Sequence, residues 1–364
     1  MKWLLFQLSW CEPEGIMTAF GPPGHPHRAS KTYRRSSGIE AIVMPGDKVL
    51  VTCATGKAGL ECCRALVDAG FDVYGTSRTS TGGMKISAVG AKPVIANYVS
   101  ELPKALQESG AKKLLFITDY FQAAKSSVEA EYQQGVHAVD SAKAAGCTHT
   151  IFISVADADK FPKACTHILA KPRVEAYLKE SGIKYSVVGP GCFFENLDDA
   201  DNYNPLKKGA LSFLMSESLK WTATYDIGRA AAVQFKAPEQ WYGKKLDVIS
   251  WVGDLEAAAK ALEKVGGFPV KRGLAMPLFA RRLFLADLDA MCKFFVSPGI
   301  ASSPSDLKKH VPDALDAEGW FRHHNRYANG EPIVGNKTPP SSSRLVYLVP
   351  VAVAVAASLF YLYK

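Results

Sequence analysis

The segment 48–78 constrains the fold of this chain more than any other part of it. A short apolar run leads into a turn of small residues, in which Gly56 and Gly59 are three positions apart. An amphipathic stretch then continues to Gly70, and a second apolar run ends at Arg78. This order of strand, glycine turn, helix and strand predicts a βαβ unit whose backbone N–H groups can approach a phosphate. We therefore expect a dinucleotide-binding site at this turn.

The residue that ends the second strand selects the dinucleotide. A carboxylate there would bind the ribose 2′-hydroxyl, whereas Arg78 offers several N–H donors to a 2′-phosphate. The sequence therefore predicts NADP(H) rather than NAD(H). One position departs from the full G-x-x-G-x-x-G pattern, because Cys53 takes the place of its first glycine. An ordinary turn that binds no ligand is the alternative.

Apolar runs recur after this unit. Four more lie at 92–96, 113–118, 150–154 and 184–188, and helical patterns separate them. Continuous apolar strands that alternate with helices are typical of parallel sheets that are buried on both faces. The expected fold class is therefore α/β, a doubly wound parallel sheet of the Rossmann type.

The alternation becomes irregular beyond about residue 193, and a long amphipathic helix is expected at Leu283–Phe295. This predicts a smaller α+β C-terminal lobe over the carboxyl ends of the sheet strands, where open α/β sheets bind ligands. We expect one domain at 45–328. Its cofactor part would span about 45–192 and its substrate lobe about 193–328.

Both ends of the chain differ from the middle. Residues 1–44 are rich in Gly, Pro, His, Arg and Ser and predict a disordered or targeting extension, and 329–343 has the composition of a linker. The run from Leu345 to Tyr363 is uncharged and close to the roughly 20 apolar residues that span a bilayer. We therefore expect a transmembrane helix at 344–364 that anchors the chain to a membrane, with the folded domain facing the cytosol. A lipid-anchor signal that is removed from the mature chain is the alternative.

Charge and cysteine content argue against two classes of function. The net charge is +8, and no basic run is interleaved with aromatic residues, so nucleic acid is not an expected partner. The eight cysteines show neither C-x-x-C pairs nor the spacing of zinc ligands. This usage is typical of a reducing compartment, and no metal site is expected.

Several segments together resemble the NmrA-like family of atypical short-chain dehydrogenases/reductases. The likeness extends from Lys48 to His324 and fits the subgroup of NADPH sensors and NAD(P)H-binding quinone reductases. The segments are VTCATGKAG at 51–59, TSR at 76–78, QGVHAVDSAKAAG at 134–146, KPRVEAYLKESGIKYSVVGPGCFFEN at 171–196 and DIGRAAA at 226–232.

The resemblance implies NADP(H) as cofactor, held by the glycine turn and Arg78. It also implies a role for Thr118 near the end of the fourth strand and for Pro190 and Gly191 beside the nicotinamide. Asn97 stands where such proteins often carry an acid that contacts adenine. The expected cofactor-binding residues are Thr52, Cys53, Thr55, Gly56, Lys57, Gly59, Arg78, Asn97, Thr118, Lys171, Pro190 and Gly191.

Catalysis in typical short-chain dehydrogenases uses Tyr-x-x-x-Lys and an upstream serine. The same register here gives His167 and Lys171, with Ser154 upstream. His167 would donate the proton and Lys171 would hold the nicotinamide ribose. Pro172 disfavours helical geometry at Lys171, so the two residues need not share one helix. In the alternative interpretation His167 only lines a pocket or the surface, and Lys171 only binds ribose.

Three functions follow as hypotheses. The first is an NADP(H)-binding redox sensor or regulator with a protein partner, because the usual tyrosine is missing. The second is an NADPH-dependent reductase of a small carbonyl or quinone. The third is a scaffold whose cofactor site has decayed, as Cys53 and Asn97 suggest.

Overall fold

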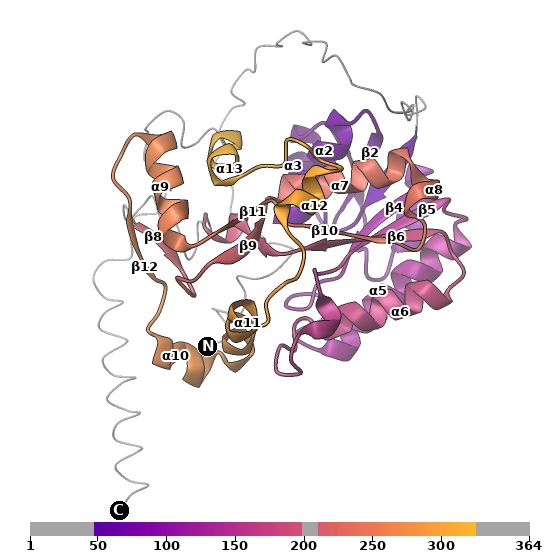
Figure 1. Ribbon diagram of the computed structural model, residues 1–364. Helices are drawn as coiled ribbons and strands as arrows, with labels where there is room; N and C mark the ends of the chain where they lie inside the picture. Colours follow the sequence, from indigo (N-terminus) through magenta and orange to yellow (C-terminus); the bar gives the residue numbers. More distant parts are fainter. Residues whose placement is uncertain (1–46, 199–209, 325–364) are drawn as a thin grey trace, which may run out of the picture.

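The computed structural model describes residues 47–198 and 210–324, and their central feature is a parallel sheet with helices on both faces (Figure 1). The sheet has seven strands in the order β10-β6-β5-β4-β1-β2-β3, and all neighbours are parallel. The chain order reverses between β1 and β4, which is where open α/β sheets bind ligands. The strands are β1 (Lys48–Val51), β2 (Asp72–Ser77), β3 (Lys92–Ile95), β4 (Lys113–Ile117), β5 (His149–Ile153), β6 (Tyr185–Pro190) and β10 (Lys245–Val248).

Alternate side chains of each strand point to opposite faces of the sheet and build two cores. In β1, Val49 and Val51 share a core with α2, α3 and α7, whereas Leu50 shares one with α4, α5 and α6. Because both faces are covered, the strands can be apolar throughout, as the sequence predicts. The helices are α2 (Lys57–Asp68), α3 (Ser80–Ala88), α4 (Leu102–Ser109), α5 (Val128–Ala144), α6 (Ala170–Glu180), α7 (Thr224–Lys236) and α8 (Pro238–Trp241).

A C-terminal lobe lies beside this sheet (Figure 1). Strands β7 (Cys192–Phe193), β9 (Leu219–Thr222) and β11 (Trp251–Gly253) form one small sheet, and β8 (Ala210–Phe213) pairs with β12 (Lys271–Leu274). α12 packs against β10 of the main sheet. The remaining helices are α9 (Leu255–Gly266), α10 (Leu278–Phe284), α11 (Ala286–Val296), α12 (Pro304–Lys308) and α13 (Ala317–His323).

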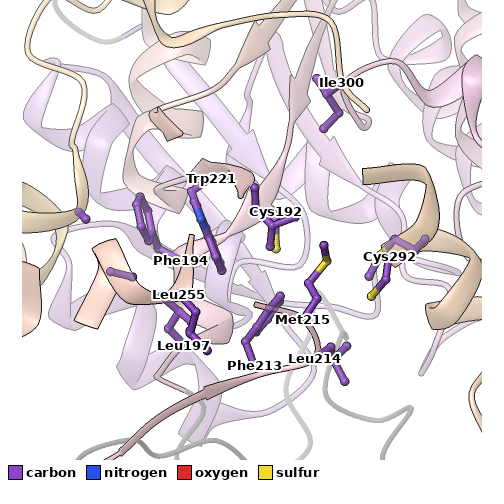
Figure 2. Close-up of a cluster of buried hydrophobic side chains, with 14 of the residues drawn as sticks. Cys192, Phe194, Leu197, Phe213, Leu214, Met215, Trp221, Leu255, Cys292 and Ile300 are labelled. Carbon is purple, nitrogen blue, oxygen red and sulfur yellow. The ribbon is translucent and has the colours of Figure 1, made fainter. Parts of the chain in front are cut away.

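Aromatic side chains form the core of the lobe, as Figure 2 shows for Phe194 and Trp221. The Phe194 ring stacks on Trp221 at a centroid distance of 5.4 Å and on Trp320 at 5.3 Å. The indole of Trp221 donates a hydrogen bond to the Gly253 carbonyl (2.8 Å), and that of Trp320 donates to the Glu195 carboxylate (2.7 Å). Burial of these rings therefore leaves neither indole donor unsatisfied.

The prediction of a single long helix at Leu283–Phe295 is wrong, because Leu285 interrupts the helix and separates α10 from α11. Leu285 has φ −133° and ψ 54°, outside the helical region. The buried Arg281 guanidinium of α10 bonds both the Asp289 carboxylate (2.9 Å) and the Leu214 carbonyl (2.6 Å). These contacts hold the two helices at an angle that the apolar spacing does not reveal.

The predicted fold class also needs correction, because it included a C-terminal transmembrane helix. No helix within 47–198 and 210–324 is long and apolar enough to cross a bilayer. The segment 344–364, to which that helix was assigned, lies outside the described residues. The described residues therefore show the α/β sheet with its C-terminal lobe. The cytosol-facing orientation depended on the same segment and remains an untested prediction.

The first residue of β5 is a buried histidine. The His149 side chain is 1% exposed, and its Nε2 lies 2.8 Å from the hydroxyl oxygen of Ser186. The rings of Phe235 and Tyr242 pack edge-on against the imidazole. This burial, together with the positive charge of Lys113, lowers the pKa of His149 from 6.5 to about 4.

We expect His149 to make the fold less stable in mild acid. The unfolded chain protonates this residue near pH 6.5 and the folded chain near pH 4, so its stabilising contribution is complete above pH 6.5 and is lost as the pH falls toward 4. Denaturant unfolding at pH 7.5 and 4.5 should show a loss of about 2–3 kcal/mol in the wild-type chain that is largely absent in His149→Gln. An equal loss in both chains would contradict this assignment.

Candidate functional site

The start of α2 offers backbone N–H groups to a ligand. Gly56 is the N-cap and Lys57 the first helical residue. Within the described chain no side chain caps this helix start, and its first turn carries no acidic residue. The first N–H groups of a helix lack partners inside it and carry partial positive charge, so they favour anions. The turn is thus suited to a phosphate group.

Gly59 lets α2 pack closely on this turn. A Cβ atom at this position would lie 2.0 Å from the backbone oxygen of Cys53. Cys53 itself has φ +49°, in the left-handed region that favours glycine. Its thiol is buried, with Sγ 3.6 Å from the Ile117 carbonyl oxygen. Cys53 therefore preserves the shape of the turn with a strained backbone.

Replacing Cys53 by glycine should change the free energy of unfolding by less than about 1 kcal/mol, although it removes a buried side chain. Glycine removes left-handed strain of about 1–2 kcal/mol, and this gain offsets the roughly 0.5–1 kcal/mol that greater freedom of the unfolded chain costs and the loss of about 1 kcal/mol from the buried thiol. Denaturant unfolding checks this, with Cys147→Gly as the control, because Cys147 has no positive φ and that change relieves no strain. A loss of stability as large as that of the control would contradict the prediction.

A groove of about 270 Å³ opens beside the turn, at the carboxyl ends of β1, β2 and β3. Arg78 follows β2 and is exposed in the lining. Asn97 follows β3, and its side-chain oxygen accepts a hydrogen bond from the Val99 N–H (3.0 Å). The groove therefore brings together Cys53 and Thr55 of the glycine turn, a guanidinium and an amide. The lining residues are Cys53, Thr55, Thr76, Ser77, Arg78, Ala96, Asn97, Tyr98, Val99, Asp119, Gln122, Ala123 and Lys125.

Asp119 is a groove residue that the sequence analysis missed. It follows β4, and its carboxylate accepts hydrogen bonds from the N–H groups of Phe121 (3.1 Å), Gln122 (3.0 Å) and Ala123 (3.1 Å). Burial raises the pKa of Asp119 above its usual range, against these hydrogen bonds. Asp119 thus shapes the loop at one end of the groove. Its position directly after an apolar run was a signal that could have identified it.

Two of the predicted cofactor contacts lie beneath the groove rather than in its lining. The buried Thr52 hydroxyl accepts a hydrogen bond from the Ile117 N–H (2.9 Å) and so ties β1 to β4. The Thr118 hydroxyl, also buried, donates to the Glu131 carboxylate (2.8 Å) and accepts from the Lys171 ammonium (2.7 Å). Both residues support the floor of the site through the hydrogen bonds of their side chains.

Lys171 forms a buried ion pair that the sequence did not suggest. Its Nζ lies 2.7 Å from a carboxylate oxygen of Glu131, and the two side chains are 1% and 0% exposed. The ammonium also lies 5.8 Å from the centre of the Phe152 ring. Thr118 and Glu131 thus both contact the Lys171 ammonium, the group that the resemblance predicts to bind the nicotinamide ribose.

The three predicted catalytic residues belong to three separate hydrogen-bond networks. The Ser154 hydroxyl donates to Glu175, which also pairs with Lys245 (2.7 Å). The Nδ1 atom of His167 lies 2.6 Å from a carboxylate oxygen of Asp287 on α11. His167 precedes α6, whereas Lys171 lies in its first turn, so the two do not share a helical face. Ser154, His167 and Lys171 therefore each contact a different carboxylate, that of Glu175, Asp287 and Glu131 respectively.

A second pocket, of about 80 Å³, lies between the glycine turn and the C-terminal lobe. Lys57 and Gly191 line one part of it, and the Gly191 N–H donates to the Thr222 hydroxyl (2.8 Å), just beyond the end of β6 at Pro190. Most of the other side chains are apolar, and Figure 2 shows Cys192, Phe213 and Ile300 among them. The full lining is Lys57, Val155, Phe161, His167, Ile168, Gly191, Cys192, Phe193, Asn196, Phe213, Met291, Phe295 and Ile300.

Comparison with known proteins identifies the family. Residues 45–284 match the NmrA-like family, and the chain belongs to it. Among solved structures, an NADPH-dependent quinone oxidoreductase from Escherichia coli in complex with NADPH is 23% identical, with a TM-score of 0.58, and the match covers 76% of this chain and 100% of that one.

Two further solved structures share the fold. NmrA, a negative transcriptional regulator in complex with NADP, is 17% identical with a TM-score of 0.59, over 77% of this chain and 95% of that one. The Citrobacter sp. triphenylmethane reductase complexed with NADP(H) is 19% identical with a TM-score of 0.60, over 76% and 99%. At these identities the likeness establishes the fold, which regulators and reductases share.

Proposed function

We propose that this chain binds NADP(H) in the groove and acts as an NADP(H)-responsive regulator. The observation that carries the proposal is that Thr55, which directly precedes the uncapped start of α2 at Gly56, lines the same groove as the exposed Arg78. A dinucleotide with a 2′-phosphate carries phosphate groups at both of the corresponding places. The NADP complexes of structural relatives support the same cofactor.

The residues of the groove fit the parts of such a dinucleotide. Gly56, Lys57 and Gly59 would hold the pyrophosphate, and the lack of a side chain at Gly59 lets α2 pack closely on the turn that presents its N–H groups. Arg78 would bind the 2′-phosphate and Asn97 the adenine. Bound in its reduced form, the dinucleotide supplies a hydride donor. The role of the protein is to bind and orient it.

A regulatory role is favoured because two of the three predicted catalytic residues are held by buried or partly buried carboxylates. Lys171 is held by Glu131, and Ser154 by Glu175. The glycine turn beside the groove also reaches the lobe, since Lys57 at the start of α2 lines the second pocket together with Met291 and Phe295 of α11. Occupancy of the groove would thereby alter the lobe and its affinity for a protein partner.

Hydrogen–deuterium exchange of the full chain with and without NADPH tests the proposal. We expect slower exchange at 53–59 and 76–81, where the dinucleotide would bind, and a change at α11, which would report coupling to the lobe. Arg78→Ala is the control and should reduce both effects at the same NADPH concentration. Protection confined to the groove would contradict the regulatory part, and absence of protection would contradict binding.

A reductase is the second candidate, and the apolar second pocket favours it. This pocket places one imidazole, that of His167, among apolar side chains next to Lys57 and Gly191. Such a site suits a small apolar molecule that a hydride donor in the groove could reduce. Reductases among the structural relatives support this candidate.

A further inference from the structure

We propose that His167 and Asp287 form a proton-donating pair that makes the second pocket a site for reducing a small neutral carbonyl compound. The inference rests on the proposed binding of NADP(H) and extends its second candidate. It assigns His167 as the catalytic acid and Asp287, which the sequence did not suggest, as the residue that positions it.

The imidazole of His167 is fixed in orientation. Its Nδ1 lies 2.6 Å from Asp287 Oδ1, which is a short, charge-assisted hydrogen bond. The ring also stacks on Phe121, with centroids 5.9 Å apart and an interplanar angle of 28°. His167 is 8% exposed and lines the pocket, and no described residue bonds its Nε2. With Nδ1 bound to Asp287, Nε2 is the atom that can donate to a ligand.

The carboxylate of Asp287 is itself held in place. Its Oδ2 accepts a hydrogen bond from the Thr166 hydroxyl (2.9 Å), which in turn lies 2.9 Å from the Tyr120 hydroxyl. Asp287 therefore faces Thr166 and His167 with one oxygen each. Tyr120 follows β4, His167 precedes α6 and Asp287 belongs to α11, so the pair exists only where the lobe packs on the main sheet. A carboxylate in this position stabilises an imidazolium and fixes its orientation.

The rest of the pocket selects the substrate. The side chains of Phe161, Phe213, Met291 and Ile300 are apolar and would disfavour a charged group. The only titratable side chains in the lining are those of His167, Lys57 and Cys192. A small, largely apolar neutral molecule with a hydrogen-bond acceptor is therefore the expected ligand, and an aldehyde or ketone carries that acceptor on its reducible group.

The reaction balances with the reduced nicotinamide dinucleotide as its reductant. The carbonyl carbon accepts a hydride, that is a hydrogen with both bonding electrons, and a new C–H bond forms. The π electrons of the C=O bond move to oxygen, which takes the proton from His167 Nε2. The products are an alcohol and the oxidised dinucleotide, and His167 regains its proton from water. Asp287 holds the His167 ring in the orientation that leaves Nε2 as the proton donor.

Nuclear magnetic resonance of the full chain without cofactor tests the pair directly. The Nδ1–H proton of His167 should resonate far downfield because of its short bond to Asp287, and the signal should disappear in His167→Gln. It should also be lost in Asp287→Asn but retained in Asp306→Asn, a matched change at an exposed aspartate that pairs with Lys309. Absence of the signal from the wild-type chain would overturn the pair.

Turnover of 4-nitrobenzaldehyde with NADPH tests the chemistry. His167→Gln and Asp287→Asn should each lower kcat/KM by about 100-fold or more, while calorimetry shows NADPH affinity unchanged within about twofold. Asp306→Asn should match the wild-type chain in both measurements. NADPH binding without aldehyde reduction, or equal activity in all chains, would overturn the inference. Absence of NADPH binding would instead refute the proposed function, and the downfield signal would still decide the existence of the pair.

Discussion

Replacing Lys171 by methionine is expected to lower the free energy of unfolding by about 3–5 kcal/mol. The change removes the ammonium that lies 2.7 Å from Glu131 and leaves a carboxylate that is 0% exposed without its counter-charge. The Thr118 hydroxyl would be the remaining donor to that carboxylate in this group. An isolated buried charge is far more costly than a neutral group of the same shape. Denaturant unfolding at pH 7 measures the loss.

Two further variants separate the charge effect from a packing effect. The double variant Lys171→Met with Glu131→Gln removes both charges and should recover at least half of the lost stability, because the amide can still bond Thr118. Lys104→Met removes a lysine that is 55% exposed and pairs with acids at 3.8 and 3.9 Å, so its effect should stay within about 0.5 kcal/mol. If Lys171→Met lowered the free energy of unfolding by less than about 1 kcal/mol, that result would contradict a buried ion pair between Lys171 and Glu131.

Replacing Gly59 by alanine should lower NADPH affinity by at least about tenfold and stability by about 1–3 kcal/mol. Helix propensity alone predicts the opposite sign, because alanine in a helix is favoured over glycine by roughly 0.5–1 kcal/mol. The new Cβ would lie 2.0 Å from the Cys53 carbonyl oxygen and 2.9 Å from Ala54 Cα, which are backbone atoms. The turn must therefore move, and its N–H groups with it.

Gly273→Ala is the matched control for this variant. A Cβ atom at Gly273 meets no other atom within 4 Å, so this change should leave NADPH affinity unchanged and stability within about 0.5 kcal/mol. Calorimetric titration and denaturant unfolding of both variants make the comparison. Wild-type affinity together with unchanged or increased stability in Gly59→Ala would contradict the close packing of α2 on the turn.

The parts of the fold that depend on local pattern could be predicted from the sequence. The apolar runs at 113–118 and 150–154 correspond to β4 (Lys113–Ile117) and β5 (His149–Ile153), because strands buried on both faces are continuously apolar. The break at Leu285 could not be predicted in this way. It depends on contacts of Arg281 with Leu214, which is far away in the sequence.

The residues of the candidate site also differ in whether local sequence pattern could predict them. The glycine turn and Arg78 lie within one βαβ unit, so their relation follows from spacing alone. Asp287 is 120 residues from His167, and no local signal connects the two. The Tyr-x-x-x-Lys register likewise gave the positions of His167 and Lys171, but not the carboxylates that hold them. Long-range pairing decides what these side chains can do, and only the folded chain specifies it.

Calorimetric titration of the full chain with NADPH and with NADH, in the wild type and in Arg78→Ala, tests the central claim most directly. A hydrogen bond to a charged group is worth about 1.5–3 kcal/mol, so NADPH should bind at least about tenfold more tightly than NADH. Arg78→Ala should remove most of that difference and leave NADH affinity nearly unchanged. Equal affinities for the two dinucleotides, or no binding of either, would contradict NADP(H) binding at this groove.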